Sequence, residues 1–266
     1  MKSYVCAVLA VSFSLWGAAA GTASAQEQAP QPSEKPAPEK AMTAQERLDA
    51  CAKKYAAAKT YRDEGTVVSE FKVPGTDQKV ANTMPIRTAF ERGGRLYWEF
   101  RGSATPGKKA DQTYAVWSTD QKSFSSYWTL TRQTSSFGDL MMALAGPTGV
   151  SSGSALAIIP LLRPDALGAH TITNITEPVD KGTDKVDGQA CTRIEGKNRA
   201  GPVTLWIDND LAVRKIVQIM EVDPSKVPAR AGQNMDKFTT TTTMTFKPAF
   251  DGQIENDRFS PPAEAK

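Results

Sequence analysis

The sequence has 266 residues, a formal net charge of +3 and 23% charged residues. Acidic and basic residues are interspersed, and no block of like charges is typical of a nucleic-acid-binding face. We therefore expect no nucleic acid among its partners. With 40% hydrophobic residues, the chain can bury a substantial core.

The first 25 residues have the pattern of a cleavable secretory signal peptide. Lys2 is followed by an apolar stretch from Val5 to Ala20, and Ala23-Ser24-Ala25 forms a small-residue cleavage site before Gln26. A transmembrane anchor is the alternative, but the stretch is short for a span of about 20 residues. We expect a monomeric periplasmic protein that starts near Gln26 and has no transmembrane segment in its mature chain.

A tether and a helix follow the predicted cleavage site. Residues 26–42 are rich in Pro, Glu, Gln and Lys, which predicts a disordered linker. Thr43 and Glu46 have the spacing of a capping box, and apolar residues at three- and four-residue spacing predict a helix as far as Ala58. Residues 43–266 are expected to form a single domain.

Beyond Tyr61 the apolar residues alternate, which predicts antiparallel strands joined by short turns. Gly93-Gly94 separates two alternating segments, as in a hairpin. The strands are expected at residues 66–73, 84–90, 95–101, 113–118, 123–130, 171–178, 185–197, 202–207, 212–222 and 235–247. This pattern predicts a mainly β (α+β) fold with one large antiparallel sheet, curved or covered by helices on one face.

The middle of the chain breaks the alternation. Residues 137–162 are apolar, rich in small residues and interrupted by Gly146-Pro147. We predict short helices laid over the sheet, as a lid; an ordinary connection that caps the core is the alternative.

No catalytic or metal-binding motif stands out, so we predict a non-enzyme without cofactor or metal. His170 is the only histidine, and it stands at a plain strand entry. The cysteines lack zinc-ligand spacing. Asp208-Asn209-Asp210 lacks the downstream glycine and glutamate of a calcium loop, so a β-turn is the better interpretation. A hydrolase with unrecognised paired carboxylates is kept as a minor alternative.

Large apolar side chains are unusually dense on the predicted strands and lid. They form either an ordinary core or the wall of an incompletely filled pocket for acyl chains. Our candidate ligand-lining residues are Leu96, Trp98, Phe100, Trp117, Phe124, Trp128, Met141, Met142, Leu144 and Trp206.

Two cysteines remain after the predicted cleavage, Cys51 and Cys191. In an oxidising compartment two cysteines most often pair, so we predict a disulfide; two separately buried thiols are the alternative.

Several segments resemble the LolA/LolB-like superfamily of periplasmic, lipoprotein-carrier-like proteins, and most closely its uncharacterised predicted periplasmic branch. The resemblance covers roughly residues 43–262, and its best-matched parts are GQACTRIEG (188–196), LWIDNDLAVRKI (205–216) and FKPAFDGQIENDRFSPP (246–262). It implies an open β-half-barrel with a helical lid. It also implies an arginine that holds the lid, for which Arg87 is the candidate, and it is consistent with a Cys51–Cys191 bridge.

The resulting functional hypothesis is a periplasmic carrier that binds a lipid or another hydrophobic ligand between sheet and lid, possibly in outer-membrane lipid or lipoprotein traffic. The alternative is a protein-interaction or envelope-sensor module on the same scaffold, without lipid transfer.

Overall fold

The computed structural model describes residues 42–72, 79–103, 108, 110–168, 171–222 and 238–265. They belong to one compact unit, Ala41–Lys266. The predicted signal peptide, most of the predicted linker and His170 lie outside the described residues. Among the described residues, no helix is both long enough and apolar enough to cross a membrane.

Helix α1 (Ala44–Ala57) forms where the sequence predicts it. The Glu46 backbone N–H donates to Thr43 Oγ1 at 3.2 Å, and Glu46 Oε2 accepts from the Thr43 backbone N–H at 2.8 Å. This capping box satisfies N–H groups that have no partner within the helix. The buried side of α1 carries Leu48, Cys51 and Tyr55.

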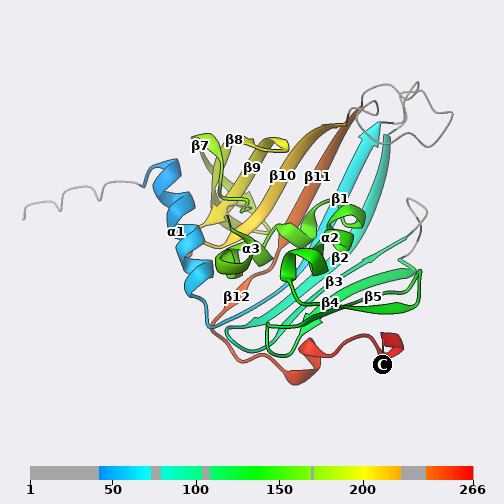
Figure 1. Cartoon of the computed structure of the whole chain (residues 1–266). Coiled ribbons are helices and arrows are strands. Elements are labelled where there is room, and N and C mark those ends of the chain that lie inside the picture. The colour runs from blue at the N-terminus through cyan, green and yellow to red at the C-terminus, as the bar shows by residue number, and fades with distance from the viewer. Residues whose placement is uncertain are drawn as a thin grey trace, which may run out of the picture. The chain divides into compact units, whose positions relative to one another are not determined.

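One antiparallel sheet makes up most of the fold, as predicted (Figure 1). Its strands run in the order β6-β5-β4-β3-β2-β1-β11-β10-β9-β8-β7, and β12 pairs with β1. The order does not close on itself, so the sheet is open, with β6 and β7 at its two edges. The bounds are β1 Thr60–Lys72, β2 Lys79–Glu91, β3 Leu96–Gly102, β4 Gln112–Ser118, β5 Phe124–Trp128, β6 Gln133–Phe137, β7 Thr176–Val186, β8 Gln189–Asn198, β9 Gly201–Asp208, β10 Val213–Val222, β11 Phe238–Phe246 and β12 Ala249–Phe250.

The two edge strands differ from the prediction. Residues 133–137 form β6 although no strand was predicted there, and β7 begins at Thr176 instead of residue 171. Both strands are mostly exposed. An edge strand of this kind has no buried face, so the alternation of apolar and polar residues that marks a strand is missing.

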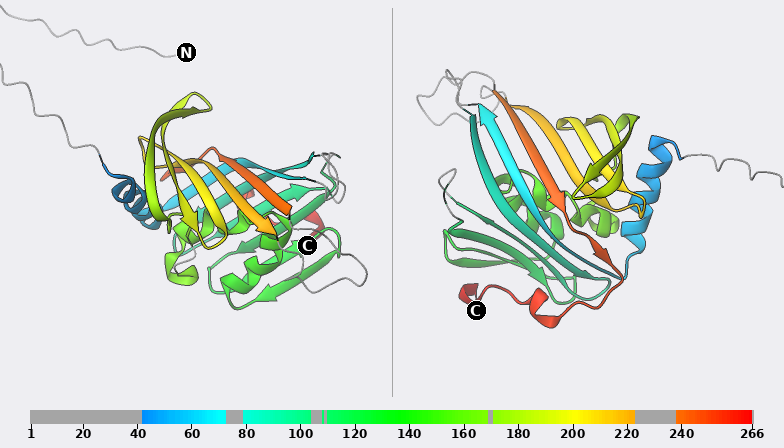
Figure 2. Two further views of the ribbon diagram at one scale, coloured as in Figure 1. Left: turned by 90° about the horizontal axis from the view of Figure 1, so that it is seen from above. Right: turned by 180° about the vertical axis from the view of Figure 1, so that it is seen from behind.

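The helical insert connects these two edges. It consists of α2 (Leu140–Val150), the 3-10 turn η1 (Ser154–Leu156), α3 (Ile159–Leu162) and α4 (Pro164–Leu167). Because β6 and β7 lie at opposite ends of the strand order, the insert must cross a face of the sheet (Figure 2). Seen from behind, the strands run in front of these helices, which therefore cover one face only (Figure 2).

The insert differs in its limits from the predicted lid. It starts at Leu140, because residue 137 still belongs to β6, and it extends to Leu167, beyond residue 162. Helix α2 also continues through Gly146 and Pro147. Gly146 permits close packing, since a Cβ atom there would lie 2.7 Å from the Tyr114 hydroxyl oxygen on β4.

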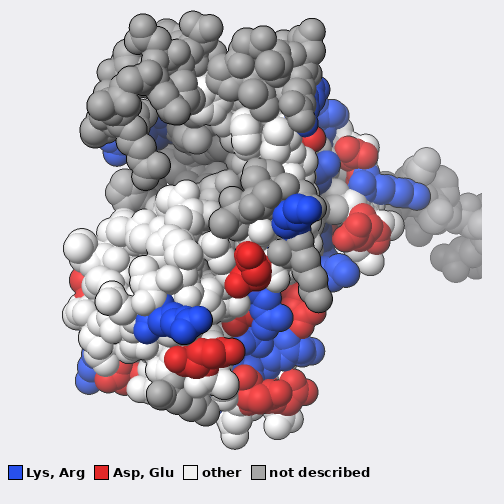
Figure 3. All heavy atoms as spheres, turned by 90° about the vertical axis from the view of Figure 1, so that its right-hand side faces the viewer, with Lys and Arg blue, Asp and Glu red and all other residues white. Residues whose placement is uncertain are grey.

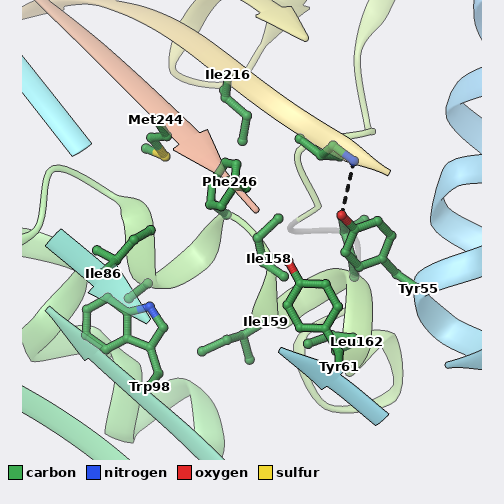
Figure 4. Close-up of a cluster of buried hydrophobic side chains, with 14 of the residues drawn as sticks. Tyr55, Tyr61, Ile86, Trp98, Ile158, Ile159, Leu162, Ile216, Met244 and Phe246 are labelled. Atoms are coloured by element: carbon green, nitrogen blue, oxygen red, sulfur yellow. Dashed lines mark hydrogen bonds between the residues drawn. The ribbon is translucent and has the colours of Figure 1, made fainter. Parts of the chain in front are cut away.

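Alternation along the strands separates an inner face, under the insert, from an outer face. On β3, Leu96, Trp98 and Phe100 belong to the main core with the helices. Tyr97 lies on the other side, in a small cluster with Phe259 of the C-terminal segment. Figure 4 shows the main core, in which side chains from the sheet, α1 and the insert meet.

Candidate functional site

The candidate site is the apolar core between the inner face and the helical insert. Of the ten candidate lining residues, Leu96, Trp98, Phe100, Phe124 and Leu144 are buried in this core. Met141 of α2 is half-buried and packs against it. Strands β3 and β5 and helix α2 thus bring together side chains that lie up to about fifty positions apart in the sequence.

An aromatic row runs from this core toward the edge at β6. The ring centroids of Trp98 and Phe100 are 5.9 Å apart, those of Phe100 and Tyr114 are 6.2 Å apart, and those of Tyr114 and Trp128 are 5.8 Å apart. Trp98 is 1% exposed, whereas Tyr114 and Trp128 are half-buried. The Trp128 indole N–H is buried without a hydrogen-bond partner. The end of this row at Tyr114 and Trp128 is therefore partly accessible to solvent.

Three candidate residues lie elsewhere. Trp117 packs on the outer face beside Tyr97. Trp206 belongs to a separate cluster with Val186 and Cys191, and its indole N–H donates to Asp184 Oδ2 at 3.0 Å. Met142 is 60% exposed. The candidates were chosen by residue type, whereas strand alternation and helical rotation decide which side chains share a face.

The core is packed, not open. Tyr55, Tyr61, Leu144 and Leu162 have no exposed surface, and Trp98 has almost none. A side chain that lined a space large enough for water would retain accessible surface. The expected incompletely filled pocket is therefore absent around these residues, and a ligand could enter only if the helices moved.

A different arginine from the one predicted holds the insert. Arg92, at the end of the β2–β3 hairpin, donates from Nε to the Ala58 carbonyl at 2.8 Å. Its Nη2 donates to the carbonyls of Tyr55 at 3.2 Å and Leu162 at 3.1 Å. One guanidinium thus satisfies carbonyls at the C-terminal ends of α1 and α3, where a cation also interacts favourably with the helix dipole.

Arg87, the candidate latch, points to the outer face. Its Nη2 donates to the Tyr97 hydroxyl at 2.9 Å and to Glu99 Oε2 at 3.0 Å. The alternation of β2 gives the reason, since Ile86 belongs to the inner core and its neighbour must point away. Arg92 follows the last residue of β2, so strand alternation does not determine where its side chain points. The sequence carries no signal that distinguishes Arg92 from neighbouring arginines.

A second polar contact ties the insert to the sheet. Arg163, between α3 and α4, donates from Nη1 to Gln121 Oε1 at 2.7 Å and forms an ion pair with Asp165 at 2.9 Å. Gln121 lies in the turn between β4 and β5, and its side chain also donates to the Glu91 carbonyl. The contacts of Arg92 and Arg163 therefore meet near the same end of the hairpins.

A carboxyl group is buried within the inner-face core. Asp63 is 4% exposed, and its Oδ2 accepts from the Tyr61 hydroxyl at 2.6 Å, while its Oδ1 has no hydrogen-bond partner. Burial raises the pKa of Asp63 to about 6, although the hydrogen bond from the Tyr61 hydroxyl opposes the shift. In the same core, the Tyr55 hydroxyl accepts from the Val213 backbone N–H at 3.1 Å, which ties α1 to β10 (Figure 4).

The predicted disulfide is not present. Cys51 and Cys191 are both free and buried. Cys51 lies in the main core, whereas Cys191 lies in the separate cluster with Trp206. Burial raises the pKa of the Cys51 thiol to about 12 and also raises that of Cys191. The alternative of two separately buried thiols describes the structure.

Across the described residues, no group of three or more His, Cys, Asp or Glu side chains is arranged to hold a metal ion. Asp208-Asn209-Asp210 forms a turn in which Asp208 accepts from the Ala212 backbone N–H at 2.8 Å and from Arg214 Nε at 2.6 Å. Its carboxylate is thus engaged within the hairpin.

No protein-family model and no curated protein sequence matches the chain. Among solved structures, it is similar to LprF from Mycobacterium bovis, with 15% identity over 84% of this chain and 97% of that chain and a TM-score of 0.42. The lipoprotein LppX from Mycobacterium tuberculosis is 14% identical over 80% of this chain and 96% of its own, with a TM-score of 0.39.

A LolA superfamily protein from Nitrosomonas europaea, of the family that the sequence resembles, is 10% identical over 83% of this chain and 99% of its own, with a TM-score of 0.29. At these scores the similarities carry no conclusion about function. The function is therefore inferred from the residues of this chain.

Proposed function

We propose that the protein is a non-enzymatic periplasmic carrier that binds a lipid or another hydrophobic ligand between the inner face and the helical insert. The observation that carries the proposal is the insert itself. It lies across an apolar face from one edge of the sheet to the other, and its hydrogen bonds to the hairpins come from Arg92 and Arg163.

Opening such a site is energetically feasible. Displacing the insert would expose the apolar side chains that it now covers, and an acyl chain could replace those contacts. Burying each methylene contributes about 0.8 kcal/mol, so a chain of twelve carbons would supply roughly 10 kcal/mol against the cost of opening. Tyr114 and Trp128, the half-buried end of the aromatic row, offer the place where a ligand could first make contact.

The location in the periplasm follows from the predicted signal peptide and belongs to the same proposal. Passage of a hydrophobic molecule between membranes requires a carrier that shields it from water. Traffic of lipids or lipoproteins toward an outer membrane is the process that such a carrier would serve.

The test is gentle purification of the exported protein, followed by native mass spectrometry and lipid extraction. Copurifying lipid at near-stoichiometric amounts is the expected result. Protein without lipid, which also fails to bind a fluorescent fatty acid, would contradict the carrier function.

Two adjacent methionines provide a matched pair of variants. Met141 is half-buried against the core, and Met142 is 60% exposed. Met141→Glu should reduce the bound lipid severalfold, because a charge is costly to bury, and Met142→Glu should leave it unchanged. Thermal unfolding of both variants shows whether Met141→Glu still folds; equal lipid loss in the two folded variants would contradict this site.

The packed interior favours a second candidate, a protein-interaction module that carries no lipid. The edge strands β6 and β7 are mostly exposed and could each pair with a strand of a partner. The same purification separates the candidates, since a copurifying protein with a lipid-free interior is expected only for the module.

A further inference from the structure

A charged hollow lies on the outer face, across the sheet from the helical insert. Its volume is about 450 Å³, and a neighbouring hollow of about 250 Å³ shares four of its lining residues. The charged side chains around the two hollows are Arg62, Glu64, Arg87, Glu99, Arg101, Lys247 and Arg258; Asp63 also borders the smaller hollow, but its side chain is buried in the inner-face core.

Strand register builds the hollow from two neighbouring rows. One row carries charges, because Glu64 of β1 pairs with Arg87 of β2, which pairs with Glu99 of β3. Two residues further along, the small side chains of Thr66 and Pro85 are paired. The small side chains of Thr66 and Pro85 leave a depression beside the long side chains of the charged row.

The C-terminal segment adds a further wall. Arg258, in the 3-10 turn η3 (Asn256–Phe259), forms an ion pair with Glu64. Lys247 follows β11, and its backbone N–H donates to the Glu64 carbonyl at 3.2 Å, which places it next to the charged row. The rim therefore combines residues from four distant parts of the chain.

Positive charge predominates on the accessible surface of the hollow. Glu99 is covered, with 4% of its side chain exposed, and it accepts from Tyr97, Arg87 and Arg101. The Arg101 side chain is 57% exposed, and Arg62 and Lys247 are also exposed. Glu64 is the exposed carboxylate of the described lining, and Arg258 neutralises it.

Figure 3 shows side chains of both signs of charge gathered on one side of the molecule. Acidic and basic side chains crowd the right of the view, the side of the outer face, whereas a broad area on the left is uncharged. Ion pairs account for the two carboxylates of the larger hollow, since Glu99 pairs with Arg87 and Arg101 and Glu64 pairs with Arg258. Lys247 and Arg62 make no side-chain hydrogen bond or ion pair to the described residues, which leaves two cations for a ligand.

We propose that the two adjoining hollows bind a phosphate-bearing ligand. Lys247 and Arg258 line both hollows, Arg62 lines the smaller one and Arg101 the larger one, and the ligand is held by Lys247 and Arg62 together with the free donors of Arg101 and Arg258. Arginine and lysine side chains suit oxyanions because they donate several charge-assisted hydrogen bonds. The phosphate can belong to a free phosphate ester or to a lipid headgroup. The inference is independent of the proposed carrier function, since the hollow lies on the opposite face from the insert.

The experiment titrates the full mature chain with inorganic phosphate and glycerol phosphate by calorimetry. A second arm measures cosedimentation with phosphatidylglycerol vesicles and with phosphatidylcholine vesicles. Saturable binding of the soluble probes indicates a free phosphate ester, and selective binding of the anionic vesicles indicates a headgroup; either result supports the site. The absence of binding in both arms overturns it.

The variant Lys247→Gln/Arg62→Gln removes the two unpaired cations and keeps the ion pairs of Arg87 and Arg258. It should weaken binding at least about tenfold, equivalent to about 1.4 kcal/mol. The matched control Lys53→Gln/Lys122→Gln removes two charges from exposed side chains elsewhere and should change binding less than about twofold. Equal weakening by both variants would assign the binding to net charge and overturn the site.

Discussion

The two faces of the sheet are built from the same strands and offer opposite conditions to a ligand. On β3, Trp98 faces inward and is 1% exposed, whereas its neighbour Glu99 faces outward, where arginines surround it. The inner face is covered and filled by the protein's own side chains, so binding there must include the work of moving helices. The outer face has a hollow that is already open. Affinity on the inner face should thus depend on fold stability, and affinity on the outer face should depend on charge.

Replacing one tryptophan on each face tests most directly whether the two faces are packed differently. Trp98→Ala removes a fully covered ring from the inner core and should lower the free energy of unfolding by about 3–5 kcal/mol. Trp117→Ala removes a half-buried ring from the outer face and should cost less than half as much. Urea denaturation of both variants measures the difference. Equal losses would show that the two faces are packed alike.

The buried Asp63 should make the unfolding free energy depend on pH, and this dependence also distinguishes the two faces. Burial raises its folded-state pKa to about 6, above the unfolded value of about 3.9, so the native state binds the proton more tightly. The contribution of Asp63 to stability is therefore greatest below pH 4 and falls as the pH rises from 4 to 6. At pH 7 the ionised carboxylate costs roughly 2–3 kcal/mol.

Asp63→Asn should remove the decrease in unfolding free energy between pH 4 and pH 6 and should raise the unfolding free energy at pH 7. Denaturation at several pH values measures both. Glu64→Gln is the neighbouring control on the outer face. The ion pair with Arg258 lowers the pKa of Glu64, so its contribution has the opposite sign and is lost as the pH falls. An unchanged slope in Asp63→Asn would contradict the assignment to Asp63.

The attachment of the insert depends on Arg92 more than on Arg87. Arg92→Gln removes charge-assisted hydrogen bonds to the ends of α1 and α3 and should destabilise the protein by about 1–3 kcal/mol. Hydrogen exchange should accelerate mainly in residues 159–167. Arg132→Gln, which changes an exposed arginine, is the control and should leave exchange unaltered. Faster exchange in both variants, or in neither, would refute the anchoring role.

The smallest expected effect concerns the cysteines, which belong to different clusters. Denaturation of non-reduced protein with an alkylating reagent should modify both Cys51 and Cys191, because both thiols are free. In the folded protein Cys51 should react slowly, since burial raises its thiol pKa to about 12. Mass spectrometry counts the labels. If neither cysteine is labelled in the denatured protein, the two must form a disulfide and this prediction is wrong.

Sequence reasoning was reliable where one side of an element is buried. Helix α1 and the central hairpins follow from the capping box, the apolar spacing and the Gly93-Gly94 turn. It failed at the edges, where β6 and β7 are exposed on both faces and their residues lack a pattern. Helix α2 passes through Gly146-Pro147, a pair that locally favours a break, and Gly146 lies close against Tyr114 of β4, a tertiary contact that the local sequence does not reveal.

The apolar character of the candidate site was predictable from the sequence, but only some of its residues were. Residue type identified Trp98, Phe100 and Leu144 as members of an apolar cluster. Type alone could not separate them from Trp117 and Trp206, which strand alternation places in other clusters. The anchoring role of Arg92 arises because the hairpin end meets two helix termini that lie distant in sequence.

By itself, the sequence determined that this chain forms an antiparallel sheet with apolar helices between two sets of strands, because local alternation and capping encode those elements. Only the tertiary structure decided that the helices cross from edge to edge and close the inner face, that the cysteines stay apart, and that Lys247, Arg258 and Arg87 meet on the outer face. Each of these features depends on which distant strands pair, and pairing is set by the packing of the whole domain.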